Sequence, residues 1–445
     1  MPQASTDFDV AVIGAGAAGL CAAAELCRQG RTVLLLEARE RVGGRVLTHY
    51  EPSLAHPLEL GAEFVHGEAP LTMQLLRSAG VAAIDTAGER FSRNDDGVHR
   101  RRSEFDQVQQ LLAQAGSLPR DLSVAEFLER YAAGEARGAL RGFVRRMVEG
   151  FDAADPHEAS VQAIAREWHG ASMGGQHRPL GGYGPVLAAL LRALDPARTR
   201  LMLGTAAEVI DWGGERVSIQ ARGAAGDLQL HARRAVVSVP VSLLQTQRPG
   251  HPPCPEHGSS LRFVPALTDK QAALERLALG AVIKVLLQFR RPFWERLAQC
   301  RYADAGFLHA SQAPFPTLWT ALPFRVPLLT AWMGGPRALR LAGAPRAQLI
   351  ELALQSVTQV FELGNEAADE LLAAYVHDWS ADPHARGAYC YLRVGGSGAP
   401  AALARPLAAR LFFAGEATHE DYTGTVEAAL QSGRSAAQAL LAADQ

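Results

Sequence analysis

Residues 9–19 read DVAVIGAGAAG, and this stretch decides the fold of the chain. The apolar, β-branched run at 9–13 is typical of a central parallel strand, and it ends at Gly14. With Gly16 and Gly19, Gly14 forms a GxGxxG pattern. In this pattern the first glycine makes a tight turn, the second lets a pyrophosphate approach, and the third lets the following helix pack closely. The stretch therefore predicts a strand, a glycine-rich turn and a dinucleotide-binding helix.

The residues that follow complete this unit. A helix and a second strand are expected within 17–36, and Glu37 stands at the end of that strand. A carboxylate in this position can accept hydrogen bonds from ribose hydroxyls. A second glycine turn then places Gly44 between Arg39 and Arg45. Such a turn lets the backbone approach a larger ligand, and both guanidinium groups are candidates for binding phosphate or flavin oxygens.

Length and composition limit the classes of protein that need to be considered. A chain of 445 residues exceeds the size of a single core, and 48% hydrophobic and 20% charged residues are ordinary for a globular protein. The 44 Lys and Arg residues nearly balance the 46 Asp and Glu residues, so no basic excess favours nucleic acid or an anionic membrane. The five cysteines contain no CxxC pair, and neither a signal peptide nor a long apolar span is evident. We expect a cytoplasmic monomer or homodimer without a metal site.

Five segments, in order along the chain, resemble the flavin-containing amine oxidase family, which includes monoamine oxidases, polyamine oxidases and lysine-specific histone demethylases. They are GGRV at 43–46, LELGAEFVHG at 58–67, IKV with RPFW within 283–294, WSADPHARGAYCYLRVG at 379–395, and LFFAGEATHEDYTGTVEAALQSG at 411–433. The resemblance covers nearly the whole chain and is nearest to the polyamine oxidase branch. Because the sequence carries no long helical insertion or chromatin-binding domain, we do not expect histone demethylation.

The pattern and the resemblance together predict an α/β fold with two domains. A Rossmann-like FAD-binding domain of doubly wound type is interleaved with an α+β substrate-binding domain. Residues 71–168 are expected to be mainly helical, residues 246–260 to form a proline-rich surface loop, and residues 346–361 to form a helix. The FAD-binding domain is assigned 1–70, 179–245 and 400–445, and the substrate-binding domain is assigned 71–178 and 246–399.

The resemblance implies that FAD is the cofactor. It assigns Glu416 to the ribityl or phosphate region, and it places a helix that starts near Thr425 against the flavin pyrimidine, where a helix N-terminus favours negative charge. Ala388 stands where monoamine oxidases carry the cysteine that links their flavin, so non-covalent binding is expected and Cys390 is read as an inert thiol. The complete set of cofactor-binding candidates is Gly14, Gly16, Gly19, Glu37, Arg39, Gly44, Arg45, Val209, Gly415, Glu416 and Val426.

Three residues are candidates for catalysis by resemblance. Lys284 matches the strand lysine that holds a water near flavin N5 in the family. Tyr389 and Thr425 match the two tyrosines that flank the substrate amine in monoamine oxidases, so one side of that aromatic cage is open here. Trp379 and Tyr391 are expected to extend its wall. The alternatives are a lysine that only snorkels and aromatic rings that only pack in a core.

Two residues of the segment at 58–67 are candidates for substrate binding. Glu63 is expected to pair with a distal ammonium group of the substrate, and His66 is expected to tune that contact near neutral pH. For both, the alternative is a purely structural role in the loop.

These observations predict FAD-dependent oxidation of an amine to an imine, with reduction of dioxygen to hydrogen peroxide. The expected substrate is a polyamine or another primary or secondary amine, and an extended amine with a second cationic group is preferred over a compact arylalkylamine. Two alternatives remain. One is a flavin-dependent desaturase or oxidoreductase of the same superfamily that acts on a non-amine substrate, and the other is a non-catalytic FAD-bearing binding protein.

Overall fold

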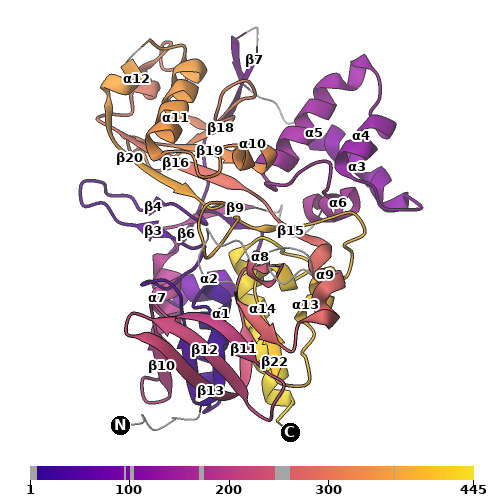
Figure 1. Ribbon diagram of the computed structural model, residues 1–445. Coiled ribbons are helices and arrows are strands. Elements are labelled where there is room, and N and C mark those ends of the chain that lie inside the picture. The colour runs from indigo at the N-terminus through magenta and orange to yellow at the C-terminus, as the bar shows by residue number, and fades with distance from the viewer. Residues whose placement is uncertain are drawn as a thin grey trace.

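The computed structural model describes residues 8–94, 97–100, 105–169, 175–245, 261–364 and 366–444. Two large sheets lie one above the other in Figure 1, a group of helices lies beside the upper sheet, and both termini lie at the lower end. The loop expected at 246–260, with Cys254, lies outside the described residues. No helix within the described ranges has both the length and the apolar character needed to cross a bilayer.

The first sheet is the dinucleotide-binding sheet predicted from residues 9–19. Its strand order is β10-β2-β1-β13-β12-β11-β14, and β22 pairs with β13. These strands are β1 (Phe8–Ile13), β2 (Val33–Leu36), β10 (Thr199–Met202), β11 (Ala206–Asp211), β12 (Val217–Gly223), β13 (Gly226–Val237), β14 (Arg262–Val264) and β22 (Leu411–Phe413). Because successive side chains of a strand face opposite ways, Ala11 and Ile13 enter one core while Val10 and Val12 enter another. Both faces of the sheet are therefore covered.

The helices that cover one face of this sheet pack closely at glycines. They are α1 (Ala17–Arg28), α2 (Pro70–Ser78), α7 (Gly184–Arg192) and α14 (Val426–Ala442). A Cβ on Gly19 would lie 1.9 Å from the carbonyl oxygen of Gly14, which is the close packing expected of the third glycine. A Cβ on Gly433 of α14 would lie 2.2 Å from the carbonyl oxygen of Ala18 in α1. The backbones of the first and last helices thus approach each other directly.

The second sheet has the order β20-β16-β19-β18-β17-β7-β8 and carries its own apolar core. The side chains of β16 are buried along its whole length, as expected of a central strand with both faces covered. The strands are β7 (Glu89–Asn94), β8 (Gly97–Arg100), β16 (Val282–Phe289), β17 (Ala305–Ala310), β18 (Thr317–Thr320), β19 (Leu328–Gly334) and β20 (Leu371–Asp378). In Figure 1 the helices α10 (Gly335–Leu339), α11 (Arg346–Phe361) and α12 (Glu366–Asp369) lie with this sheet.

Four helices form a separate cluster beside the second sheet, with buried residues such as Phe127 and Trp168. They are α3 (Phe105–Ala113), α4 (Val124–Tyr131), α5 (Gly138–Gly150) and α6 (Val161–His169). Short strands connect the parts: β3 (Thr48–His49), β4 (Leu58–Glu59), β5 (Val65–His66), β6 (Ala83–Asp85), β9 (Gln176–Pro179), β15 (Leu277–Leu279) and β21 (Cys390–Leu392). The remaining helices are α8 (Val241–Leu244), α9 (Gln271–Glu275), α13 (Ala399–Ala404) and the 3-10 turns η1 (Gln114–Ser117), η2 (Glu135–Arg137), η5 (Thr268–Lys270), η6 (Phe293–Arg296) and η7 (Glu416–Thr418).

The predicted α/β fold class is confirmed, and so is the helix expected at 346–361. Residues 71–168 are mainly helical as expected, but the stretch also contains the short strands β6, β7 and β8. Strand β7 pairs in parallel with the distant strand β17, a partner that local sequence cannot reveal. The division into two domains stays a prediction. Strand β14 and helix α2, assigned to the second domain, lie with the first sheet and its helices.

The close approach of α1 and α14 leads to a stability prediction. Gly433→Ala is expected to lower the free energy of unfolding by about 1–3 kcal/mol, because the added methyl group meets backbone that cannot move independently. Gly116→Ala is the matched control, since a Cβ there meets nothing within 4 Å. Urea denaturation of both variants checks this, and equal stability of Gly433→Ala and the wild type would contradict the packing described.

Candidate active site

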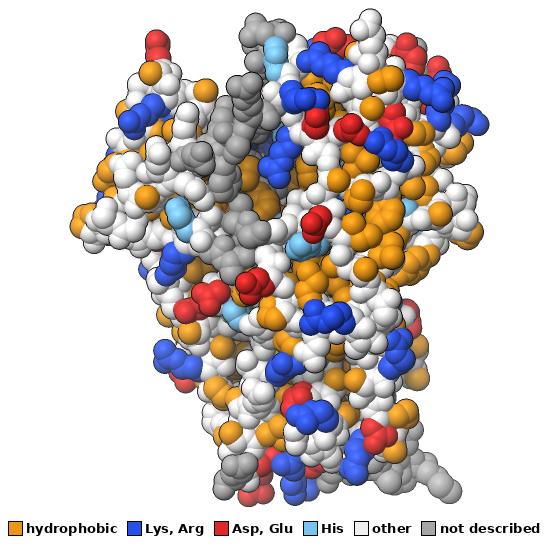
Figure 2. Space-filling model, turned by 180° about the vertical axis from the view of Figure 1, so that it is seen from behind, with side chains coloured by type: hydrophobic (Ala, Val, Ile, Leu, Met, Phe, Trp, Pro, Cys, Tyr) orange, Lys and Arg blue, Asp and Glu red, His pale blue; other side chains and the backbone are white. Residues whose placement is uncertain are grey.

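A large cavity runs between the two sheets and is lined by residues of both. Its volume is about 2130 Å³, well above the roughly 300–1,000 Å³ that usually holds one small ligand. The glycine turn of the first sheet lines one part of it, and Lys284 of β16 lines another. On the molecular face shown in Figure 2, acidic and basic side chains are interspersed, in keeping with the formal charge of −2. The cavity has room for a dinucleotide together with a substrate.

The part of the cavity at the glycine turns fits a dinucleotide. Gly14 has a φ of +99° and Gly44 a φ of +57°, backbone conformations that favour glycine. A Cβ on Gly44 would lie 3.5 Å from the Cα atom of Gly16, so the two glycine turns abut. The buried carboxylate of Glu37 accepts hydrogen bonds from the backbone N–H groups of Ala15 (2.9 Å) and Arg39 (3.0 Å). These N–H groups fix the carboxylate at the place where the GxGxxG pattern predicts a ribose.

Two of the predicted cofactor residues do not line this cavity. Gly19 lies inside α1, where its role is close packing. Val209 is buried in β11, and the neighbouring Ala206 and Ala207 line the cavity instead. The pairing register of β11 shifts between Ala207 and Val209, which changes the side that each residue presents. The assignment of Val209 to the cofactor site is therefore corrected.

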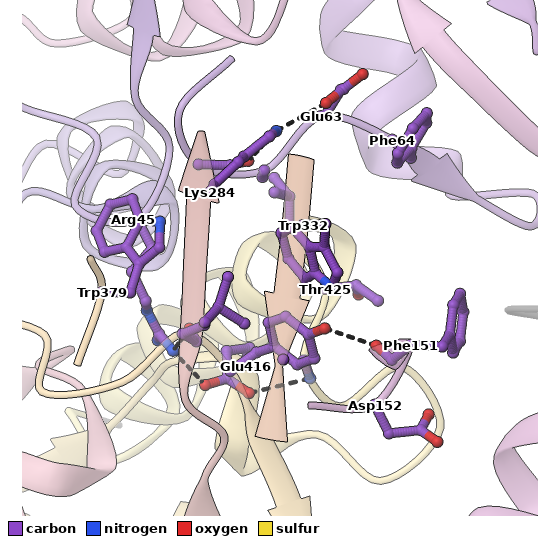
Figure 3. A pocket seen from close by; sticks show the side chains of 18 of the residues that line it. Arg45, Glu63, Phe64, Phe151, Asp152, Lys284, Trp332, Trp379, Glu416 and Thr425 are labelled. Atoms are coloured by element: carbon purple, nitrogen blue, oxygen red, sulfur yellow. Dashed lines mark hydrogen bonds and ion pairs between the residues drawn. The ribbon is translucent and has the colours of Figure 1, made fainter. Parts of the chain in front are cut away.

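The glutamate of the closing motif binds three segments together. One Glu416 oxygen lies 2.8 Å from a guanidinium nitrogen of Arg45, and the other accepts from the N–H groups of Gly424 (3.0 Å) and Cys390 (3.3 Å). Figure 3 shows Glu416 and Arg45 directed toward each other below Trp379. Arg45 also donates to the carbonyl of Ala388 at 2.6 Å. Both charged residues line the cavity, but the carboxylate is bound to protein, so it positions Arg45 and the backbone.

The other predicted arginine is anchored in a similar way. A guanidinium nitrogen of Arg39 donates to a carboxylate oxygen of Asp382. Burial by itself would raise the pKa of Asp382, but its contacts with His377 and Arg39 and the charge of Arg39 lower it instead. Arg39 lines the cavity, and this ion pair fixes it beside Glu37. The segment at 379–395 thus supports the nucleotide part of the cavity as well as the substrate part.

Thr425 begins α14, and its hydroxyl is fully used there. The hydroxyl oxygen accepts from the N–H of Ala428 at 3.0 Å and donates to the carbonyl of Tyr422 at 2.7 Å. An N-cap of this kind stabilises the first turn of a helix. Thr425 and Val426 both line the cavity, so the helix N-terminus lies at its wall as expected. The hydroxyl of Thr425 thus has a capping role and no free donor, and the assignment of Thr425 as a catalytic residue stays a prediction.

Lys284 is buried and belongs to a compact network of charges. Its ammonium nitrogen lies 2.7 Å from a Glu63 oxygen and 3.3 Å from the carbonyl oxygen of Gly61. The other Glu63 oxygen accepts from Arg178 and from the indole of Trp319, both at 3.0 Å. Burial would raise the pKa of Glu63, but the charges of Lys284 and Arg178 lower it to about 2. Figure 3 shows Lys284 directed toward Glu63.

The assignments of Glu63 and His66 to substrate binding are corrected by these contacts. Two cations of the protein already neutralise Glu63, so it positions Lys284 and is not open to a distal ammonium. The His66 ring packs edge-on against Phe151, with 5.5 Å between the ring centroids. Burial, and secondarily His177, lower the pKa of His66 to about 4. Both effects favour the neutral form of the His66 ring.

The aromatic residues of segment 379–395 divide between the cavity wall and the core. All of Trp379, Tyr389 and Tyr391 line the cavity. The indole of Trp379 donates to the carbonyl of Leu60 at 3.0 Å, and the hydroxyl of Tyr389 donates to the carbonyl of Phe151 at 2.6 Å. Tyr391 packs mainly in the core of the helical cluster. The structure thus places Trp379 and Tyr389 on the wall and gives Tyr391 a largely structural position.

Several residues that shape the site escaped sequence reasoning. They are Trp319 and Trp332 of the second sheet, Glu167 of α6, Asp152 just after α5, and Arg178 of β9. For these residues the sequence holds no motif that signals the site. Within the described ranges, no group of three or more His, Cys, Asp or Glu side chains could hold a metal ion.

The fold and the cavity define a class of proteins in which a doubly wound dinucleotide-binding sheet is joined to a second sheet that carries a buried lysine. Comparison with known proteins identifies the family. The model of the flavin-containing amine oxidoreductases matches residues 17–441, and the chain belongs to this family. The predicted enzyme class, a flavin-dependent amine oxidoreductase, is confirmed at the level of the family.

Individual relatives are distant. Polyamine oxidase 3 of Oryza sativa subsp. japonica is 28% identical over 96% of this chain and 88% of its own length. Lysine-specific histone demethylase 1 homolog 3 of Arabidopsis thaliana is 27% identical over 95% of this chain, but the chain spans only 29% of that protein. Among solved structures, putrescine oxidase bound to putrescine has a TM-score of 0.79 at 21% identity, covering 98% of this chain and 99% of its own. Cyclohexylamine oxidase from Brevibacterium oxydans IH-35A has a TM-score of 0.78 at 22% identity, with 98% of both chains covered. These structures share the fold.

The charge network around Lys284 leads to a stability prediction. Glu63→Gln is expected to lower the free energy of unfolding by about 3–5 kcal/mol, because it leaves Lys284 and Arg178 buried without their carboxylate. The combination of Glu63→Gln with Lys284→Met removes one of these cations and should cost less than Glu63→Gln alone. Denaturant unfolding of the single and double variants tests this. A double variant less stable than Glu63→Gln would show that Lys284 does not depend on Glu63 for its charge balance.

Proposed function

We propose that the protein is an FAD-dependent oxidase that converts a primary or secondary amine to an imine and reduces dioxygen to hydrogen peroxide. The observation that carries this proposal is the large cavity that joins the glycine turns to a buried, ion-paired lysine. Family membership supports oxidation of amines in general. The two-domain division, a cytoplasmic location and a monomeric or homodimeric state remain predictions from the sequence.

FAD is the dinucleotide that we propose for the cavity, bound without a covalent link. Gly14, Gly16, Gly44 and Glu37 would hold its nucleotide part. Ala388 lines the cavity with a methyl group, which cannot form a thioether. Burial, with the nearby charge of Glu416, raises the pKa of the Cys390 thiol well above its usual range. The thiol is therefore held in its unreactive protonated form.

When bound, the flavin supplies a hydride acceptor for the carbon beside the amine nitrogen. The chain's own residues orient and stabilise the reacting groups. The N-terminus of α14, capped by Thr425, presents backbone N–H groups and a positive helix end to the cavity wall. Tyr389 and Trp379 offer aromatic faces beside which an amine can be held.

Lys284 has a separate role in this proposal. An ammonium group has three N–H donors, and Glu63 and Gly61 accept two of them. The third is available to hold a water or a reacting oxygen at the cavity wall. Because Glu63 keeps its negative charge at any ordinary pH, it keeps the Lys284 side chain in a fixed orientation.

The test of the function is anaerobic bleaching of the flavin by a panel of primary amines, polyamines and amino acids, followed by peroxide measurement in air. At least one amine is expected to bleach the flavin and to give peroxide. Bleaching by a non-amine substrate alone would support the desaturase alternative. Failure of the whole panel to bleach the flavin would contradict amine oxidation and favour the binding protein.

Lys284→Met is expected to retain FAD but to slow flavin reduction or reoxidation at least about tenfold, measured by stopped-flow absorbance. Glu63 keeps Arg178 and Trp319 as partners in this variant, so the local fold should survive. Lys270→Met is the matched control. Lys270 is also buried, but it donates to the carbonyls of Ala402 and Arg405 and does not line the cavity. Unchanged rates of both half-reactions in Lys284→Met would remove this lysine from the mechanism.

A further inference from the structure

The C-terminal end of α5 forms a rigid part of the cavity wall. The indole of Trp332 donates to the carbonyl of Gly150 at 2.7 Å, and the hydroxyl of Tyr389 donates to the carbonyl of Phe151 at 2.6 Å. A Cβ on Gly334 of β19 would lie 2.5 Å from the carbonyl oxygen of Glu149, so the strand contacts this helix end directly. These three contacts hold the backbone of residues 149–151, and they thereby fix the position of the next residue, Asp152.

Asp152 is a buried carboxylate with an unused oxygen. Its side chain lines the cavity although the residue is only 4% exposed. One oxygen, Oδ1, accepts from the indole of Trp168 at 3.2 Å. The other oxygen, Oδ2, is buried and has no hydrogen-bond partner. No Lys, Arg or His nitrogen of the described chain lies within ion-pair distance of it. A buried carboxylate without a counter-charge is costly, and such groups are normally paired.

A second acid, Glu167 of α6, lines the same cavity. Burial raises the pKa of Glu167 to about 7. Burial, and then the charge of Glu167, raise the pKa of Asp152 well above its usual range. Burial and the charges of both acids also raise the pKa of the Tyr389 phenol. Trp168 donates a hydrogen bond to Asp152, and the Tyr389 phenol lies close enough to be influenced by both acids. A cation placed here would lower the pKa values of both acids and be stabilised by them.

The position of the pair relative to Lys284 is informative. Figure 3 shows Asp152 and Lys284 at opposite sides of the labelled side chains, with Trp332 and Thr425 between them. Both residues also line the same cavity, so one extended molecule could contact both. The cavity also has a basic part, lined by Arg90, Arg146 and Arg337, which would suit an anionic group instead. Arg337 already donates to the carbonyls of Ser311 and Ala313. The unpartnered oxygen of Asp152 favours a cation.

We propose that Asp152 and Glu167 form a subsite for a second ammonium group, so that the substrate is a linear diamine or polyamine whose other nitrogen lies beside the reacting carbon. This inference rests on the proposed amine oxidation and names its substrate class. It assigns to Asp152 and Glu167 the contact with a distal ammonium group that was expected of Glu63 from the sequence.

The first test compares three amines of equal length: a linear diamine, the monoamine in which a methyl group replaces the distal ammonium, and the amino acid in which a carboxylate replaces it. Several chain lengths are included. In wild-type holoenzyme, kcat/KM for the best diamine should exceed that of both partners. In Asp152→Asn it should fall about 10- to 100-fold for the diamine and change less than about threefold for the monoamine. Asparagine can still accept from Trp168, so the fold is preserved.

Glu68→Gln is the matched control, because Glu68 is an exposed carboxylate that lines the same cavity. It should leave both substrates unaffected. Equal losses for diamine and monoamine in Asp152→Asn would overturn the subsite, and so would a preference of the wild type for the monoamine or the amino acid. In these cases amine oxidation itself still stands, because the monoamine or amino acid is oxidised.

The second test measures protons released on binding, by calorimetry of reduced, anaerobic holoenzyme in buffers of different ionisation enthalpy. Reduced enzyme binds the amine but cannot oxidise it, so this readout does not depend on activity. Near pH 7 the diamine should release more protons than the monoamine, because its second ammonium lowers the pKa values of the acid pair. The difference should disappear in Asp152→Asn and in Glu167→Gln. Equal release by both amines in the wild type would overturn the proposal.

Discussion

The carboxylate of Glu63 joins the segment at 58–67 to β16 and β18 of the second sheet and to β9 of a separate short sheet. Lys284 of β16, Arg178 of β9 and Trp319 of β18 each donate a hydrogen bond to this carboxylate. The donor–acceptor distances are 2.7, 3.0 and 3.0 Å. A buried carboxylate and a buried ammonium group each need an opposite charge nearby. Glu63 and Lys284 therefore offset each other's cost of burial. The position of Lys284, and hence the chemistry proposed for the cavity, depends on this contact.

Glu416 performs a similar task on the other side of the cavity. It binds Arg45 from the second glycine turn and backbone N–H groups from the segments that follow residues 389 and 423. Together with the ion pair of Arg39 and Asp382, it ties the dinucleotide-binding turns to the aromatic segment. The cavity is thus held open by hydrogen-bonded charges, whereas the apolar cores lie behind the sheets on either side.

The buried acids of this protein differ in one respect that bears on function. Glu37, Glu63 and Glu416 each have N–H donors of the protein on both oxygens. Asp152 has a donor on only one. Because polar groups buried in proteins are generally satisfied, this oxygen without a partner supports the subsite proposed at Asp152.

Sequence alone determined the dinucleotide-binding unit, because glycine spacing and runs of buried apolar residues are local properties of the chain. The candidacy of Lys284 came from the resemblance to the flavin-containing amine oxidases. Sequence alone could not determine which charges meet. Glu63 and Lys284 are 221 positions apart, and Arg39 and Asp382 are 343 apart. Only the tertiary structure showed that Glu63 is already paired, that Thr425 caps a helix, and that Asp152 is not compensated. Side-chain pairing between distant segments depends on how the sheets pack, and no local pattern encodes it.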